Sequence, residues 1–191
     1  CRSIEVTKLS NRSDFMSESD SSTANQIVLG DISVSTATPE LPSPLLTASG
    51  QLTNAALVLV RVTSRCGVEG HSYLFSPNAK LLAALASAVS VAFEEVKGRS
   101  CSPETNTDYL LDKFKLFGGT GILTMAFAAI DMASWDLLGR ALGKPLYRLW
   151  GGTNTSIPSY ESSGLSIGSF DQVLDQAKTF LSNGNSRMKV R

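Results

Sequence analysis

Two cations near the end of the sequence, Lys189 and Arg191, have the types and the spacing of a carboxylate-binding pair. The segment RMKVR alternates apolar and basic residues as a strand does, so both cations would lie on one face of it. At the open end of a parallel barrel, two cations on one face can bind a carboxylate and stabilise the negative charge that develops when a carbon acid loses its proton. Without further context, a solvated strand edge is the commoner explanation of such a pair.

Three other side chains are candidates for chemistry, and each has a structural explanation. His71, in GHSYLF, is the only histidine of the chain. The sequence does not give the geometry that a serine-histidine-acid triad requires, and hydrogen-bonded structural histidines are commoner than catalytic ones. Asp131 and Asp136 are five residues apart, too far round a helix to converge on one metal. We therefore expect capping and packing roles for both, with Asp136 paired to Arg140 on the next helical turn.

The composition is typical of a globular protein that binds small or neutral partners. Hydrophobic residues make up 42% of the chain, and 17 basic residues balance 17 acidic ones, so the net charge favours neither nucleic acid nor an anionic membrane. The three cysteines are odd in number and form no CxxC pair, which indicates neither a disulfide framework nor a zinc site. We expect a cytoplasmic protein with reduced thiols, no nucleic-acid partner and no membrane association.

The elements that must position these residues begin with three strands. The segment QIVLGDISVSTATP and residues 56–63 and 68–74 are rich in β-formers, and residues 64–67 have the composition of a turn. They predict a three-stranded antiparallel meander. The segment ELPSPLLTASGQLTN, between the first two strands, predicts an exposed loop because of its prolines, glycine and small polar residues.

Three helices are expected after the strands. The first begins with Ser76 as N-cap and Pro77 as the first helical residue, and it ends near Gly98. A short helix is expected over residues 106–114. The third, over residues 120–142, is apolar on nearly every side, and a helix with so little polar surface is expected to be buried.

The last part of the sequence predicts the beginning of an α/β unit. SIPSYES predicts a strand, SFDQVLDQAKTFLSNG predicts an amphipathic helix with Ser169 as its cap and Gly184 as its stop, and RMKVR predicts the next strand. Strand, helix and strand in this order form one crossover unit of a parallel sheet. Few residues follow Gly152, whereas a closed eight-stranded barrel needs about 250. We therefore expect the second domain to be incomplete and the chain to be a fragment.

The stretch AFAAIDMASWDLLGRALGKPLYRLWGG resembles the signature of the mandelate racemase and muconate lactonizing enzyme family in the enolase superfamily. GHSYLF, PLLTASG and SYESSGLS bring the resemblance closest to the mandelate racemase branch, and it runs in register from about Gln26 to the last residue. It implies an α+β capping domain, a meander plus helices, followed by the first β-α-β unit of a truncated TIM-type α/β barrel. The domains expected are a disordered or untranslated extension (1–25), the capping domain (26–152) and the start of the barrel domain (153–191).

The resemblance also implies a reaction. The family removes the proton alpha to a carboxylate and holds the resulting enediolate on Mg2+. Lys189 matches a lysine that contacts the substrate carboxylate, and Arg191 matches a second lysine that serves as a base. Arginine, with a pKa above about 12, is a poor proton acceptor at neutral pH, so Arg191 departs from the pattern and would act as an electrostatic clamp.

Six further positions match substrate-binding residues of the family. Ser162 matches a serine that hydrogen-bonds the substrate carboxylate, and Tyr73 matches a residue of the pocket wall. The flexible loop that closes over the substrate is matched by Leu45, Thr47, Ser49 and Leu52. His71 is not the catalytic histidine of the family by this comparison. The acidic magnesium ligands and the His-Asp dyad belong to later barrel strands, so we expect this chain to contain no metal ligands and to be inactive alone.

The preferred hypothesis is the N-terminal part of a magnesium-dependent enzyme that acts on a 2-hydroxy acid. A sugar-acid dehydratase of the same superfamily is the alternative, which Arg191 and the polar Thr47 and Ser49 favour, whereas Leu45, Leu52 and Tyr73 suit an aromatic acid. An alternative from a different class is a non-catalytic capping module that only associates with another chain. The expected partners are a small carboxylate substrate and, when the protein is full length, further copies of the chain.

Overall fold

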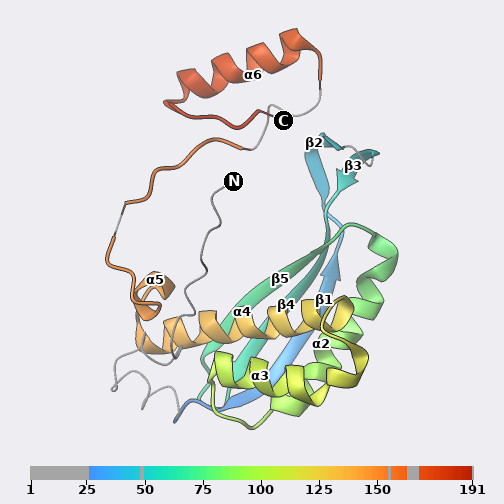
Figure 1. Cartoon of the computed structure of the whole chain (residues 1–191), viewed down its shortest axis with the longest axis vertical. Helices are drawn as coiled ribbons and strands as arrows, with labels where there is room; N and C mark the ends of the chain where they lie inside the picture. The colour runs from blue at the N-terminus through green and yellow to red at the C-terminus, as the bar shows by residue number, and fades with distance from the viewer. Residues whose placement is uncertain (1–25, 48–49, 155, 163–167, 191) are drawn as a thin grey trace, which may run out of the picture.

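A three-stranded antiparallel sheet with helices on one face forms the centre of the computed structural model (Figure 1). The structure describes residues 26–47, 50–154, 156–162 and 168–190, and for Ser43, Leu46 and Thr47 it describes only the backbone. The strands of the sheet, in spatial order, are β1 (Leu29–Ala37), β4 (Ala56–Ser64) and β5 (Glu69–Ser76). The predicted three-stranded antiparallel meander is therefore confirmed.

Strand β4 is the central strand, paired with β1 on one side and β5 on the other, and its side chains alternate between the two faces of the sheet. Val58, Val60 and Val62 point to the helical side and are buried, whereas Leu59 and Arg61 lie on the opposite, uncovered face. β-Branched residues pack well on such a pleated surface. The turn after β4 is closed by the Ser64 N–H, which donates to the Val68 carbonyl at 2.8 Å.

The segment between β1 and β4 is a β-hairpin, so the expectation of a loop was wrong, although none of its described side chains is buried. Strand β2 (Glu40–Thr47) pairs antiparallel with β3 (Gly50–Asn54), and Figure 1 shows this ribbon extending beyond the end of the sheet. Prolines suggested a loop because they lack the N–H that a strand donates. Here Pro42 and Pro44 fall where the register of the pairing is irregular, and a two-stranded ribbon needs hydrogen bonds on only one edge of each strand.

Two helices follow β5, and the first begins later than expected. Ser76 is the last residue of β5 instead of a helix cap, and its hydroxyl donates to the Asn78 carbonyl. Asn78 is the cap, since its side chain accepts the Lys80 N–H at 3.0 Å. This cap opens the 3-10 turn η2 (Ala79–Leu81), which leads into α2 (Leu82–Val96). The next helix, α3 (Pro103–Lys113), begins earlier than expected, with its proline in the first turn.

Helix α4 (Ile122–Leu142) is the main core helix, as its apolar sequence predicted. It packs against β5, β4, α2 and α3, with Ala126, Ala129, Ala133 and Leu137 buried. The helix is long and apolar enough to cross a membrane. However, 56% of its apolar 18-residue stretch is buried inside the molecule, which is typical of a core helix. Helix α4 ends at Gly143, whose left-handed backbone favours glycine.

The C-terminal part contains a short helix, α5 (Leu146–Leu149), and an amphipathic one, α6 (Phe170–Ser182), which lies apart from the sheet in Figure 1. Ser169 caps α6 in a capping box with Gln172, as predicted for Ser169. The two predicted strands are reduced to one parallel bridge between Glu161 and Met188. The parallel direction agrees with a crossover unit, but pairs of strands need neighbours to be stable. The barrel itself stays a prediction.

Candidate functional site

The GHSYLF motif forms an edge contact between β5 and α4. A Cβ atom at Gly70 would overlap the Ala133 carbonyl oxygen, so glycine is what allows the helix to approach the strand. The next residue, His71, donates its backbone N–H to the Asp136 Oδ2 at 2.8 Å. The hydroxyl of Ser72 donates to the Ala129 carbonyl at 2.6 Å. We call these three interactions the β5–α4 edge contact, and they explain three consecutive residues of the motif structurally.

The side chain of His71 lies between two carboxylates at the surface. Its Nδ1 is 3.7 Å from the Asp136 Oδ2, and its Nε2 is 3.9 Å from the Glu69 Oε2. Asp136 also accepts the Nε–H of Arg140 at 2.8 Å, so the predicted i,i+4 pair is confirmed. These contacts agree with the structural role expected of His71.

The two aspartates of α4 have separate partners. Asp131 accepts the Thr107 hydroxyl at 3.0 Å, which ties α3 to α4, whereas Asp136 binds β5. Within residues 26–190, apart from the gaps given above, no group of three or more His, Cys, Asp or Glu side chains is close enough to hold a metal ion. The packing roles expected of the two aspartates agree with these separate contacts.

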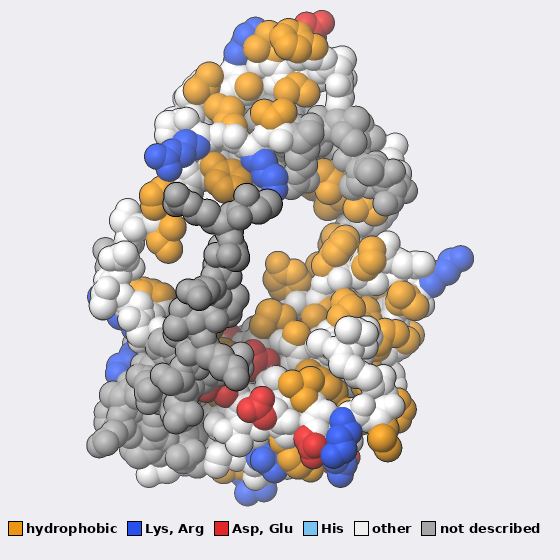
Figure 2. Space-filling view, in the orientation of Figure 1, with side chains coloured by type: hydrophobic (Ala, Val, Ile, Leu, Met, Phe, Trp, Pro, Cys, Tyr) orange, Lys and Arg blue, Asp and Glu red, His pale blue; other side chains and the backbone are white. Residues whose placement is uncertain are grey.

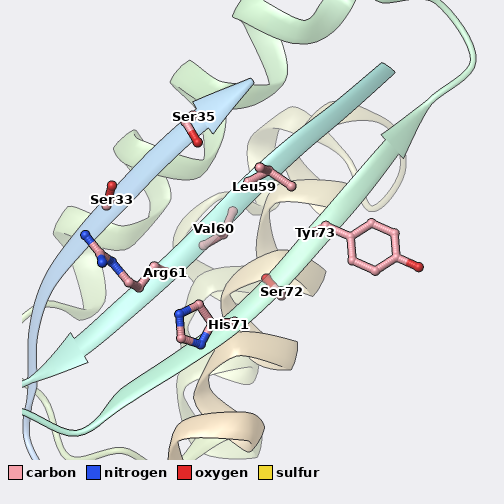
Figure 3. A pocket seen from close by; sticks show the side chains of 8 residues that line it. All are labelled: Ser33, Ser35, Leu59, Val60, Arg61, His71, Ser72 and Tyr73. Atoms are coloured by element: carbon pink, nitrogen blue, oxygen red, sulfur yellow. The ribbon is translucent and has the colours of Figure 1, made fainter. Parts of the chain in front are cut away.

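Tyr73 lies on the uncovered face of the sheet, at the edge of a cavity of about 530 Å3 (Figure 3). Its side chain is 63% exposed and projects outward from β5. Leu59 stands opposite Tyr73 in the β4–β5 register, and Phe75 follows on the same face. Sequence reasoning missed both neighbours, although the period-two alternation of the strands places them on one face with Tyr73.

Tyr73 also lines a second cavity, of about 790 Å3, between β5, α4 and α5. Trp135 and Trp150 line this cavity, and their rings meet edge to face with centroids 5.6 Å apart. Tyr73 therefore faces open space on two sides. Its position depends on the backbone of β5 more than on packing of its own side chain.

The hairpin brings two predicted substrate residues together. Leu45 and Leu52 are direct partners in the β2–β3 register, and both side chains are half-buried. Thr47 pairs with Gly50 through the backbone, while Ser49 lies outside the described residues. The apolar pair was predicted as part of a mobile loop, whereas the register of a hairpin fixes it.

The predicted carboxylate-binding residues meet at the Glu161–Met188 bridge. Lys189 donates its backbone N–H to the Glu161 carbonyl at 2.9 Å, and Ser162 donates its own N–H to the Glu161 Oε1 at 2.9 Å. The Lys189 side chain is exposed. An ammonium and a hydroxyl at neighbouring positions could bind one carboxylate. Arg191 lies outside the described residues, and the half-buried Glu161 is a neighbour that the sequence did not reveal.

The shifted pKa values belong to residues other than the predicted site residues. A hydrogen bond between Ser64 and the exposed Cys66 lowers the pKa of the Cys66 thiol, whereas burial raises the pKa of Cys101 to about 12. The carboxylate of Asp31, 2.6 Å from the Lys97 Nζ, raises the pKa of that ammonium. Since thiolates are the reactive form of cysteine, Cys101 is an inert core residue.

One family matches most of the chain. Its description is "Mandelate racemase / muconate lactonizing enzyme, N-terminal domain", and the match covers residues 31–151. Among curated relatives, the L-talarate/galactarate dehydratase of Salmonella typhimurium is 28% identical over 157 residues, which are 81% of this chain and 39% of that protein. The arabinonate dehydratase of Saccharolobus solfataricus is 36% identical over 61 residues, 30% of this chain and 16% of that protein.

Solved structures resemble the same part of the fold. An enolase from Bradyrhizobium, complexed with magnesium and mandelic acid, has a TM-score of 0.78 and 30% identity, over 86% of this chain and 45% of that one. The Salmonella L-talarate/galactarate dehydratase, liganded with magnesium and L-lyxarohydroxamate, has a TM-score of 0.74 and 25% identity, over 86% of this chain and 44% of that one. The chain thus spans less than half the length of these relatives.

Proposed function

Because the chain belongs to the mandelate racemase / muconate lactonizing enzyme family, we propose that the whole protein removes the proton alpha to the carboxylate of a 2-hydroxy acid. The observation that carries the proposal is the family match over residues 31–151, supported by a relative of 30% identity that was solved with magnesium and mandelic acid. Mandelic acid is itself a 2-hydroxy acid. The described chain would supply part of the substrate site.

Magnesium does not fit the residues that the structure describes in this chain. Mg2+ binds oxygen ligands in octahedral geometry, usually with one or two carboxylates. Among the described residues, no three or more His, Cys, Asp or Glu side chains lie close enough together to hold an ion. We therefore propose that the ligands of such an ion, which two of the solved relatives hold, lie in another part of the whole protein.

The chain's own contribution to the chemistry would be to bind and orient the carboxylate. Loss of the alpha proton moves negative charge onto the carboxylate, and a preorganised cation stabilises that charge more in the transition state than in the ground state. Lys189 would supply the cation and Ser162 a hydroxyl donor. Their backbones are fixed to each other through Glu161, which keeps the two groups at neighbouring positions.

The hairpin would shield the reacting carbon from water. Leu45 and Leu52 present an apolar pair from adjacent strands, and an apolar cover over a charged site strengthens electrostatic interactions inside it by excluding water. Tyr73 would form part of the wall that contacts the rest of the substrate. Its exposed ring suits an aromatic or an extended acid equally.

A sugar-acid dehydratase is the second candidate. The specific observation in its favour is the 28% identity with the Salmonella L-talarate/galactarate dehydratase over 81% of this chain. Both candidates begin with removal of the same alpha proton from a 2-hydroxy acid. They differ afterwards, because a racemase returns a proton to the opposite face of the same carbon, whereas a dehydratase expels the hydroxyl of the next carbon as water.

The test is an assay of the full-length protein with Mg2+ in heavy water. Mandelate and a panel of sugar acids would be followed by proton NMR, which reports loss of the alpha proton for either reaction. Inverted, deuterated substrate would identify a racemase, and a 2-keto-3-deoxy acid would identify a dehydratase. If no 2-hydroxy acid of the panel loses its alpha proton, the proposal is wrong and a non-catalytic capping module becomes the better explanation.

A further inference from the structure

We propose that Asp136 is a positioning residue of the substrate site, because it fixes the strand that carries Tyr73. The inference rests on the proposed function, since it takes Tyr73 as part of the substrate wall. Asp136 lies 65 residues away from His71 in the sequence, and its Oδ2 accepts the His71 backbone N–H at 2.8 Å while the imidazole Nδ1 stays 3.7 Å away. Its role is therefore to hold a strand in place, and the side chain that benefits is one residue beyond Ser72.

The β5–α4 edge contact holds three consecutive residues of β5. Ala129, Ala133 and Asp136 lie on one stripe of α4, four and three residues apart, and they meet Ser72, Gly70 and His71. Two of the three interactions use the helix backbone. Asp136 is the one α4 residue of the three whose side chain accepts a hydrogen bond from β5, so its substitution changes the contact from the helix side without altering the α4 backbone.

The position of Tyr73 depends on this contact and on the pairing of β5 with β4, because the Tyr73 side chain has little packing of its own. Its side chain is 63% exposed, and cavities open on both sides of it, one on the sheet face and one towards Trp135. β5 is an edge strand, paired with β4 on one side only. Without the carboxylate, the free edge of β5 could shift, and small displacements of groups that contact a substrate lower binding or rate strongly.

Two bonds of Asp136 must be separated to test the idea. The same Oδ2 accepts the His71 N–H and the Arg140 Nε–H, both at 2.8 Å. Asp136→Ala removes both bonds, whereas Asp136→Asn keeps an oxygen that can accept from His71. Arg140→Gln removes the ion pair and leaves the bond to His71. This last variant is the matched control, since it removes the other partner of the same carboxylate and leaves the hydrogen bond to β5 in place.

The experiment measures kcat and KM of the full-length protein with its best 2-hydroxy acid. For Asp136→Ala we expect KM to rise about tenfold while kcat stays within about twofold, because substrate positioning is lost and the reacting groups are untouched. Asp136→Asn should return KM to within about threefold of the wild type, and Arg140→Gln should leave it within about twofold. A merely structural role would instead lower the amount of active protein, which reduces the apparent kcat at constant KM.

The outcomes separate this inference from the proposed function. If the wild-type protein turns over a 2-hydroxy acid but Asp136→Ala leaves KM unchanged, or Asp136→Asn fails to restore it, the inference is overturned while the proposed function stands. If the wild type acts on no such acid, the proposed function fails. Hydrogen exchange of the amides from His71 to Phe75 then tests the placement of β5 directly. Unchanged protection of these amides in Asp136→Ala would show that Asp136 does not hold β5 in place. Faster exchange than in Arg140→Gln would support that role of Asp136.

Discussion

The sheet with its helices (residues 27–142) and the described C-terminal segment (residues 156–162 and 168–190) differ in the interactions that stabilise them. The first region has a continuous apolar core, in which Phe93 and Val89 of α2 and Leu137 of α4 are fully buried. Helix α6 of the second has no buried residue, and Figure 2 shows hydrophobic side chains exposed over it. Its capping box forms nonetheless. Local signals can therefore shape a helix, but only neighbouring elements can bury it.

The largest expected effect is the difference in stability between two phenylalanine substitutions, one in each region. Phe93→Ala, at a fully buried position of α2, should lower the free energy of unfolding of the chain by about 4 kcal/mol through lost burial and a cavity. Phe170→Ala, at a position of α6 that is 78% exposed, should lower it by less than about 0.5 kcal/mol. Urea denaturation followed by circular dichroism gives both values. Equal effects would show that α6 shares the core.

The same pair sharpens the comparison in the full-length protein. If the C-terminal segment begins a barrel, the apolar side of α6 would pack on the strands of that barrel, and burial of a phenylalanine contributes several kcal/mol. We then expect Phe170→Ala to approach the effect of Phe93→Ala. An unchanged, small effect in the longer protein would contradict the proposed barrel.

The second prediction concerns the close approach of α4 to β5. Gly70→Ala places a Cβ against the backbone of Ala133 and Leu137, so either the helix or the strand must move, and we expect a loss of about 3 kcal/mol in the free energy of unfolding. Gly119→Ala is the control, since its added Cβ meets nothing within 4 Å. Chemical denaturation of both variants checks the difference. A Gly70→Ala protein as stable as the control would mean that α4 and β5 are further apart.

The contrast between the two regions also shows what the sequence could predict. The alternating valines of β4 and the apolar α4 are consequences of burial, and Ser169 is a local cap, so each leaves a pattern in consecutive residues. The bond from His71 to Asp136 leaves no such pattern, because it joins a backbone group to a side chain 65 residues away. Only the folded arrangement reveals that GHSYLF is the partner of α4.

For the candidate site, the sequence predicted the residue types but missed the contacts between them. The prolines of β2 led to the prediction of a loop in place of the β2–β3 hairpin. The pairing of Leu45 with Leu52 was missed with it, because register depends on which strands meet. Ser162 and Lys189 were assigned by resemblance, and their common contact with Glu161 follows from a bridge between segments on either side of α6. Residue types are visible in a sequence, whereas the partners across a sheet are visible only once the chain is folded.

The third prediction tests chemistry in the C-terminal segment. In the full-length protein, Lys189→Met should lower kcat/KM by about a hundredfold, because it removes a cation that the proposed mechanism uses to bind the carboxylate. Lys178→Met is the control, since Lys178 is an exposed lysine of α6 that pairs with Asp175. Steady-state kinetics with the best substrate measure both. Equal activity of the two variants would remove Lys189 from the site.

The smallest expected effect concerns the local signal that shapes α6. Ser169→Ala removes the acceptor for the Gln172 N–H and one half of the capping box, which should lower the stability of this helix by about 1 kcal/mol. Ser182→Ala, at the other end of α6, removes only a hydroxyl bond to the Thr179 carbonyl and should change it little. Hydrogen exchange of the α6 amides is the appropriate measurement, because the global free energy of unfolding of the chain depends on the sheet. If Ser169→Ala leaves exchange in α6 unchanged, the helix is held by packing, and the difference between the two regions is smaller than the described structure indicates.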